Sequence, residues 1–204
     1  MNDLHEFCVR MIGADDAGPV AEQARSQGAG DPIEELAAAA AICRSRGEPA
    51  RADDDDDDRD SSGKDLPLAQ AVARELAVAT SVMPQRQREA LALRELLALS
   101  HREISRVMGI ETMAVPPLLA RARLRLRREL RGGPDAAPDC SDRERSLRAL
   151  AMRQDGELSD EQENAWLLEH LGDCDPCTRA HAAMLEASVC YRAWRPEAGA
   201  AARS

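Results

Sequence analysis

The feature that most constrains the fold of this chain is a run of metal-ligating residues in its last third. His170, Cys174 and Cys177 form an HxxxCxxC pattern, and Cys140 lies upstream of them. A His and a Cys four residues apart are expected on one helical face, and a CxxC pair closes a turn around a single ion. The pattern therefore predicts a tetrahedral structural Zn²⁺ site with these three residues as ligands.

Two residues compete for the fourth position of this site. Cys140 is the preferred ligand, and His181 is the alternative because it lies four residues after Cys177 on the same helical face. The remaining cysteines are expected at inert apolar positions; they are Cys8, Cys43 and Cys190.

Cysteine use also indicates the compartment. The sequence has six cysteines and shows no secretory leader, which favours metal ligands or free thiols in reducing cytoplasm over a disulfide framework. No apolar run approaches the ~18 residues that a membrane span needs. We therefore expect a cytoplasmic protein without a membrane partner.

Composition predicts an all-α fold. Aromatic residues make up only 2% of the chain, so the core must be built from Leu, Ala, Val and Met. Little of the sequence favours strands. We expect small helical domains joined by linkers, each with a thin core that a metal ion would help to hold together.

The pattern along the chain divides it into six segments. The first and third are helical, the second is an acidic disordered linker with six consecutive aspartates, and the fifth is the metal-binding segment. The predicted boundaries are 1–50, 51–65, 66–132, 133–138 (a short linker), 139–194 and 195–204 (a tail).

Residues 84–131 are predicted to form a helix-turn-helix. Ser100 and Glu103 fit a capping box for a short helix that ends at Gly109, and a long helix follows from Thr112 or Pro116 to about Leu130. This segment holds eleven arginines and five acidic residues, in a chain whose net charge is −10. A basic module in an acidic chain can bind phosphate locally. The candidate DNA-binding residues are Arg102, Arg106, Arg121, Arg123, Arg125, Arg127 and Arg128.

Three strings of this segment resemble region 4 of the extracytoplasmic-function type of sigma-70 family sigma factors. They are MPQRQREALALRE (83–95), LSHREISRVMGI (99–110) and LARAR (119–123). The resemblance implies a last helix that enters the major groove of a −35 promoter element, and contact with the flap of the RNA polymerase core. Pro116, Pro117 and Leu118 replace the Lys-Ser-Arg cluster with which the family faces DNA. We therefore expect a shortened or kinked helix start and weak, salt-sensitive and poorly selective binding of promoter DNA.

The N-terminal segment is similar to a degenerate sigma region 2. The similarity rests on FCVRMIG (7–13), on Asp15-Asp16-Ala17 and on residues 38–46. Promoter opening captures flipped bases, commonly on aromatic side chains, and there is no Phe, Tyr or Trp between Cys8 and Ser81. We expect a remnant that aids folding or binds a partner; a plain helical extension is the alternative.

The metal-binding segment looks like the zinc-binding anti-sigma domain. The matching residues are Asp155-Gly-Glu-Leu-Ser159 and the run from His170 to Cys177. Helices are expected over 141–154, from the N-cap Ser159 to Leu171, and over 176–191. The resemblance implies a three-helix clamp that binds a sigma domain, either in the same chain or in a partner.

Two functions remain open at this point. The first is a sigma-factor-like transcription regulator with a fused zinc-binding anti-sigma domain. The second is a protein-interaction regulator that no longer recognises promoters. An enzyme is not expected, because the chain has four histidines, no paired nucleophile and base, and no Gly-rich phosphate loop.

Overall fold

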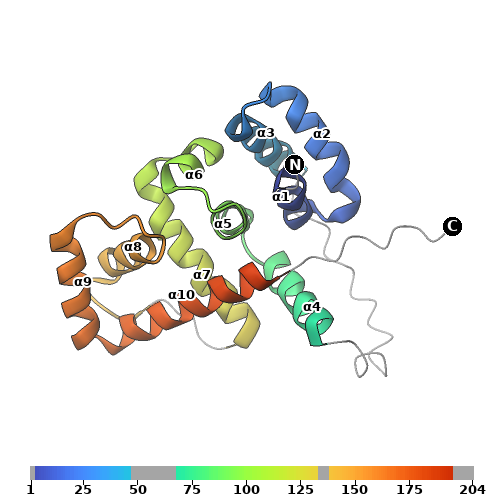
Figure 1. Ribbon diagram of the computed structural model, residues 1–204. Coiled ribbons are helices and arrows are strands. Elements are labelled where there is room, and N and C mark those ends of the chain that lie inside the picture. The colour runs from blue at the N-terminus through green and yellow to red at the C-terminus, as the bar shows by residue number, and fades with distance from the viewer. Residues whose placement is uncertain (1–2, 47–67, 133–137, 195–204) are drawn as a thin grey trace.

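The computed structural model describes residues 3–46, 68–132 and 138–194 (Figure 1). Over these ranges the chain forms ten α-helices, one π-helical turn and one 3₁₀ turn, without a strand. The prediction of an all-α fold is confirmed.

The N-terminal helices are α1 (Asp3–Ile12), α2 (Ala14–Gly28) and α3 (Pro32–Ser45). They are separated near Gly13 and Gly30, which adopt φ angles of 91° and 90°. The side chain of Asp31 caps α3 by accepting hydrogen bonds from the amides of Ile33 and Glu34. The three helices pack together as one corner of the molecule, drawn in blue in Figure 1.

The middle of the chain contains the helix-turn-helix. Its elements are α4 (Leu68–Ser81), α5 (Gln85–Leu91), the π-helical turn η1 (Ala92–Leu96), α6 (His101–Met108), the 3₁₀ turn η2 (Thr112–Ala114) and α7 (Val115–Arg131). The capping box of Ser100 and Glu103 is present, and Gly109 ends α6 in the left-handed region with φ 62°. These two predictions are confirmed.

The two prolines do not kink α7. Pro116 and Pro117 lie in its first turn, where backbone amides have no intrahelical acceptor, so their missing N–H groups remove no hydrogen bond. Pro116 is buried, and the prolines begin the helix directly after η2. The expected distortion is therefore absent from the start of α7.

The C-terminal helices are α8 (Arg143–Gln154), α9 (Glu161–Asp173) and α10 (Asp175–Ala193). The predicted N-cap of α9 was wrong by one residue. Asp160, and not Ser159, accepts hydrogen bonds from the amides of Gln162 and Glu163. A carboxylate at that position also favours the positive end of the helix dipole.

Three predicted segments are wholly or mainly outside the described residues. They are the acidic linker 51–65, the short linker 133–138 except for the buried Pro138, and the tail 195–204.

Helix α7 lies at the centre of the fold and contributes to all three hydrophobic clusters. Val115 and Leu119 pack with the N-terminal helices, and Ala122 and Leu126 pack with α4 and α10. Ala120 and Leu124 pack with α8, α9 and α10. Figure 1 shows α10 crossing α7 in the middle of the molecule. The segments therefore share cores through one helix.

The first and last helices also meet. The guanidinium of Arg10 on α1 donates to the carbonyl of Trp194 at 2.8 Å and lies 5.1 Å from the centre of the Trp194 ring. A second contact joins α3 to the middle of the chain, where Arg44 pairs with the buried carboxylate of Glu89 on α5. Among the described residues, no helix is long and apolar enough to cross a membrane.

The junction of α2 and α3 offers a test of this packing. A Cβ added at Gly28 would lie 2.5 Å from the backbone nitrogen of Glu35, too close for any atom pair. We expect Gly28→Ala to lower the free energy of unfolding by about 1–3 kcal/mol, measured by urea denaturation.

Gly172→Ala is the matched control. It lies in α9 with no heavy atom within 4 Å of the added Cβ, so stability should stay the same or rise slightly. Equal stability of the two variants would contradict the close packing of α2 against α3.

Candidate functional site

Four predicted ligands come together at one end of the C-terminal helices. The ligand atoms of Cys140, His170, Cys174 and Cys177 all lie within 4.8 Å of one another. The Sγ of Cys140 is 3.5 Å from Nε2 of His170. Three sulfurs and one imidazole nitrogen around one point form a group that could hold a metal ion. His181 is not part of this group, so the described residues favour Cys140 as the fourth member.

The four residues come from separate elements. Cys140 precedes α8, His170 is in the last turn of α9, and Cys177 is in the first turn of α10. Cys174 has an extended backbone (φ −122°, ψ 90°) between α9 and α10. The expectation that His170 and Cys174 share a helical face was therefore wrong. The chain leaves the helix after Asp173, and this break turns the sulfur of Cys174 toward the histidine.

The surroundings of the cluster are ordered by aromatic and polar contacts. The ring of Trp166 stacks on that of His170, with centroids 5.1 Å apart. A hydrogen bond from the backbone of Cys177 lowers the pKa of the Cys174 thiol. Burial raises the pKa of the Cys177 thiol to about 12. A cation would oppose the second effect, because it favours the thiolate form that binds metal.

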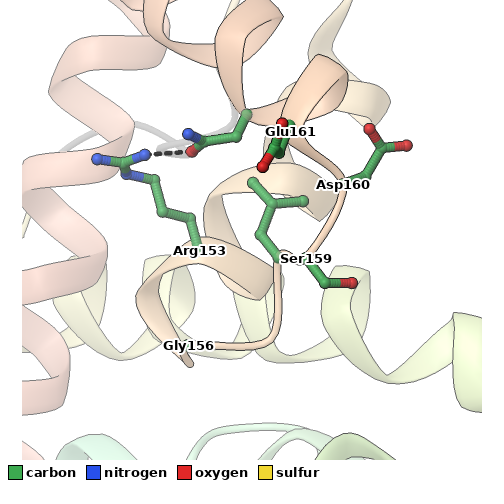
Figure 2. A pocket seen from close by; sticks show the side chains of 7 residues that line it. Arg153, Gly156, Ser159, Asp160 and Glu161 are labelled. Carbon is green, nitrogen blue, oxygen red and sulfur yellow. Dashed lines mark hydrogen bonds between the residues drawn. The ribbon is translucent and has the colours of Figure 1, made fainter.

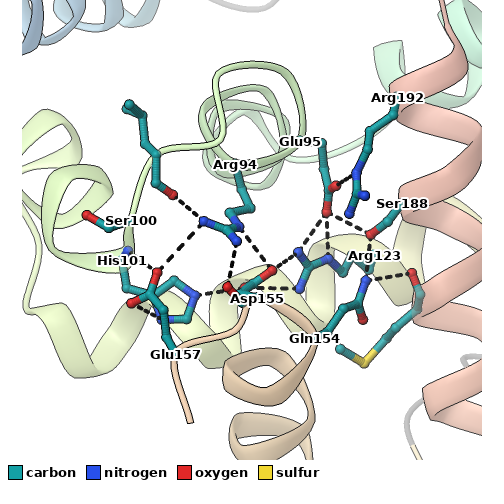
Figure 3. A network of polar contacts seen from close by, with 12 residues as sticks. Arg94, Glu95, Ser100, His101, Arg123, Gln154, Asp155, Glu157, Ser188 and Arg192 are labelled. Carbon is teal, nitrogen blue, oxygen red and sulfur yellow. Dashed lines mark hydrogen bonds and ion pairs between the residues drawn. The ribbon is translucent and has the colours of Figure 1, made fainter. Parts of the chain in front are cut away.

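The turn that follows α8 joins this metal-binding segment to the helix-turn-helix. Asp155, with a side chain 1% exposed, lies against three cationic or polar side chains of the other segment (Figure 3). Its carboxylate accepts from Arg123 at 2.5 Å, from Arg94 at 3.1 Å and lies 2.8 Å from Nε2 of His101. Its backbone carbonyl also accepts from Arg94 at 2.7 Å. One short turn therefore reaches both η1 and α7.

Glu157, two residues later, holds the start of α6. Its carboxylate accepts the backbone amide of His101 at 2.9 Å and lies 3.4 Å from Nδ1 of the His101 ring. The first amides of a helix have no intrahelical acceptor and attract negative charge. Glu157 therefore caps α6, the first helix of the helix-turn-helix, although it belongs to another part of the chain.

A second carboxylate completes the network from the opposite side. Glu95 of η1 is 1% exposed at its side chain and accepts from Arg123 at 2.8 Å. It also accepts from Ser188 and Arg192 of α10, each at 2.7 Å. The fully buried guanidinium of Arg123 is thus held between Glu95 and Asp155, as Figure 3 shows.

The network keeps Asp155 ionised. Burial alone would raise the pKa of this carboxyl, but hydrogen bonds from His101 and Arg123 and the charges of Arg123 and Arg94 outweigh it and lower the pKa to about 2. A carboxylate that is buried and charged binds its partners more strongly than an exposed one.

The outer side of the same turn forms a small pocket (Figure 2). Gly156 makes the turn with φ 73°, and Asp160 is used as the N-cap of α9. Arg153 donates to the side chain of Asn164 across the pocket. These polar groups already form contacts that stabilise the turn. We therefore interpret the pocket as the outer surface of the turn that positions Asp155, and not as a separate binding site.

The seven candidate DNA-binding arginines fall into two groups. Arg102, Arg106 and Arg121 are exposed. The others are engaged within the chain: Arg123 is buried, Arg125 and Arg128 contact Glu129, and Arg127 contacts Glu186 of α10. In this conformation Arg123 cannot reach a phosphate, because no part of its side chain is exposed.

Sequence reasoning missed most of the buried network. It noted Asp155 and Glu157 only as part of a resembling string, and assigned no role to Arg94, Glu95 or His101. The available signal was weak. Arg94 and Glu95 are adjacent charged residues in an otherwise apolar stretch, and this pattern is as typical of a solvent-exposed helix face as of a buried ion pair.

Comparison with known proteins supports one part of this interpretation. Residues 73–126 match the family model described as Sigma-70, region 4. The match extends from α4 through most of α7 and supports a sigma-70-type, DNA-binding helix-turn-helix in this segment. No match was found among curated proteins or among solved structures.

The pKa of Asp155 predicts how stability depends on pH. Because the folded value of about 2 lies below the ordinary value of 3.8, the ionised carboxylate contributes fully above about pH 5, and this contribution is lost as the pH falls from 4 to 2. Protonated Asp155 resembles asparagine in shape. The difference in unfolding free energy between wild type and Asp155→Asn should therefore shrink by about 2 kcal/mol over that interval.

Urea denaturation of both proteins at each pH measures this difference, in which the titration of groups outside the network cancels. Glu161→Gln, at an exposed position in the first turn of α9, is the control and should show a constant difference. A constant difference for Asp155→Asn would contradict the network.

Proposed function

We propose that the chain is a sigma-factor-like transcription regulator in which the zinc-binding segment, residues 139–194, restrains the helix-turn-helix of the same chain. The observation that carries this proposal is the insertion of Asp155 between Arg94, Arg123 and His101. The same segment caps α6 through Glu157 and packs α8 and α10 against α7. The match to sigma-70 region 4 supports transcription as the process.

Zinc is the metal that best suits the cluster. Three thiolates and one neutral imidazole form a Cys₃His set, a common closed set for structural Zn²⁺. Four protein ligands leave no open position for substrate, so the ion would have a structural role and the protein would act by binding and not as an enzyme. Bound zinc would join the ends of α8, α9 and α10 and thereby hold the turn of Asp155 in place.

The partners implied by this function are the RNA polymerase core and promoter DNA. Exposed Arg102, Arg106 and Arg121 can bind phosphates without sequence preference. At the start of α7, exposed Met113 and the prolines offer few groups that donate hydrogen bonds to base edges. We therefore propose weak promoter selectivity.

A protein-interaction regulator is the second candidate. It is favoured by the engagement of Arg127 and Arg131 with Glu186, which removes two cations from the surface that DNA could use. In that case the restrained conformation is the functional one, and the chain binds a partner without directing transcription.

Loosening α10 distinguishes these functions. Glu186→Lys would replace two ion pairs by repulsion against Arg127 and Arg131, without burying a new charge. If α10 restrains the helix-turn-helix, this change should strengthen binding to the polymerase core by about fivefold, equivalent to about 1 kcal/mol. Promoter-dependent transcripts should rise with it in a reconstituted transcription assay.

The matched control is Glu169→Lys, an equal charge change at an exposed position of α9. If polymerase-core binding and transcript levels rise with Glu186→Lys but not with Glu169→Lys, the result supports the sigma-factor-like regulator. Absence of transcripts from wild type and from both variants would exclude the first function and leave the second.

Metal removal gives an independent prediction. The purified protein should contain one zinc ion per chain, and chelation should lower helicity, because ligand binding and folding are coupled at such sites. Cys177→Ser should have the same effect, whereas Cys190→Ser, outside the cluster, should retain the metal. Metal analysis and circular dichroism measure both, and unchanged helicity after chelation would contradict a structural role.

A further inference from the structure

A basic groove lies between the helix-turn-helix and the metal-binding segment. Its volume is about 540 Å³, within the range of ligand-binding clefts. One wall includes Met113 of η2, Pro117 and Arg121 of the helix-turn-helix, and the other is formed by α8. The groove therefore opens beside the turn that joins α6 to α7.

Four arginines line this groove, and three of them come from α8. They are Arg121 on α7, and Arg143, Arg145 and Arg148 on α8. One carboxylate, Glu144, lies among them. Arg145 is bound to Glu163 at 2.7 Å and lies over the ring of Trp166, and Arg148 is 3.8 Å from the same Glu163. The groove keeps a positive excess after these contacts are counted.

The arginines of α7 differ in whether they form ion pairs, and the difference depends on their distance from the groove. Further along α7, Arg123, Arg125 and Arg127 each contact a carboxylate of the chain. Arg121 and Arg143 are exposed, and no ion pair is formed by either with any described residue. Guanidinium groups that converge on a groove without a carboxylate partner are suited to bind an anion from outside, and phosphate is the anion that their planar geometry fits best.

We propose that this groove binds a backbone phosphate of duplex DNA, with Arg121 from the helix-turn-helix and Arg143 and Arg148 from the metal-binding segment as its contacts. The segment that restrains the helix-turn-helix then also extends its DNA-binding surface. The proposal rests on the proposed function in taking DNA as the partner, but it requires neither polymerase nor release of the network around Asp155.

Two observations favour duplex DNA. The groove lies at the turn of a helix-turn-helix, a unit that places its two helices on a DNA duplex, and Arg102 and Arg106 of α6 are exposed on the same unit. The chain as a whole has a net charge of −10, so most of its surface repels a polyanion. A localised basic groove in an acidic protein determines the orientation in which DNA can approach.

The test is equilibrium binding of a fluorescently labelled duplex of mixed sequence to the full chain, at several salt concentrations. The variant is Arg143→Gln together with Arg148→Gln. We expect affinity to fall about tenfold at 100 mM salt, and the slope of log affinity against log salt to decrease by about one, because the groove binds one phosphate. The control is Arg25→Gln together with Arg74→Gln, on exposed positions of α2 and α4, which changes the net charge equally. Metal content and helicity are measured for each protein to confirm the fold.

The outcomes separate the groove from the proposed function. A loss specific to the α8 variant supports the groove. If wild type binds the duplex and the two double variants lose affinity equally, the groove is excluded while DNA binding stands. If wild type binds single-stranded RNA or polyphosphate but not the duplex, the proposal of a DNA phosphate is overturned. Failure of the proposed function is seen separately, as absence of core binding and transcripts.

Discussion

The fold depends on one buried cation. The guanidinium of Arg123 is inaccessible to solvent and contacts Glu95 of the π-helical turn η1 and Asp155 of the turn after α8. A charge in such a place is tolerated only when its hydrogen-bonding groups find charged partners, and loss of one partner from a buried pair typically costs about 3–5 kcal/mol. The two segments of the chain therefore cannot separate without taking Asp155, one of its two carboxylate partners, away from Arg123. This requirement links the metal-binding segment to the helix-turn-helix more tightly than apolar contact alone.

The position of α7 explains why this link involves the whole molecule. Its apolar residues face three clusters in turn, so the helix is surrounded by the N-terminal corner, by α4 and α10, and by α8 and α9. Thin cores were expected from a chain with 2% aromatic residues. The structure accommodates thin cores by having one central helix contribute residues to each of the three clusters.

Local signals were predictable from sequence and distant ones were not. The capping box of Ser100 and the end of α6 at Gly109 depend on residues within a few positions, and both were placed correctly. The HxxxCxxC run was found because its spacing is local, whereas Cys140 lies 30 residues before His170 and the fold alone brings the two together. Arg123 was predicted to bind DNA because it lies on a helix rich in arginine. Nothing in the local sequence indicates that Asp155, 32 residues later, will pair with it. Ser159 was predicted as the N-cap of α9, but Asp160 has this role; both residue types cap helices well, and only the path of the turn decides between them.

The chain order of these contacts has a consequence for synthesis. Arg123 meets Glu95 within the helix-turn-helix, but Asp155 and the contact of α10 with Glu95 come from residues translated later. At about 5–20 residues per second, the ribosome needs several seconds to complete the C-terminal helices. During that interval Arg123 has Glu95 but not yet Asp155 as a partner. If residues 139–194 restrain the helix-turn-helix as proposed, each newly made chain passes through a brief period before that restraint exists.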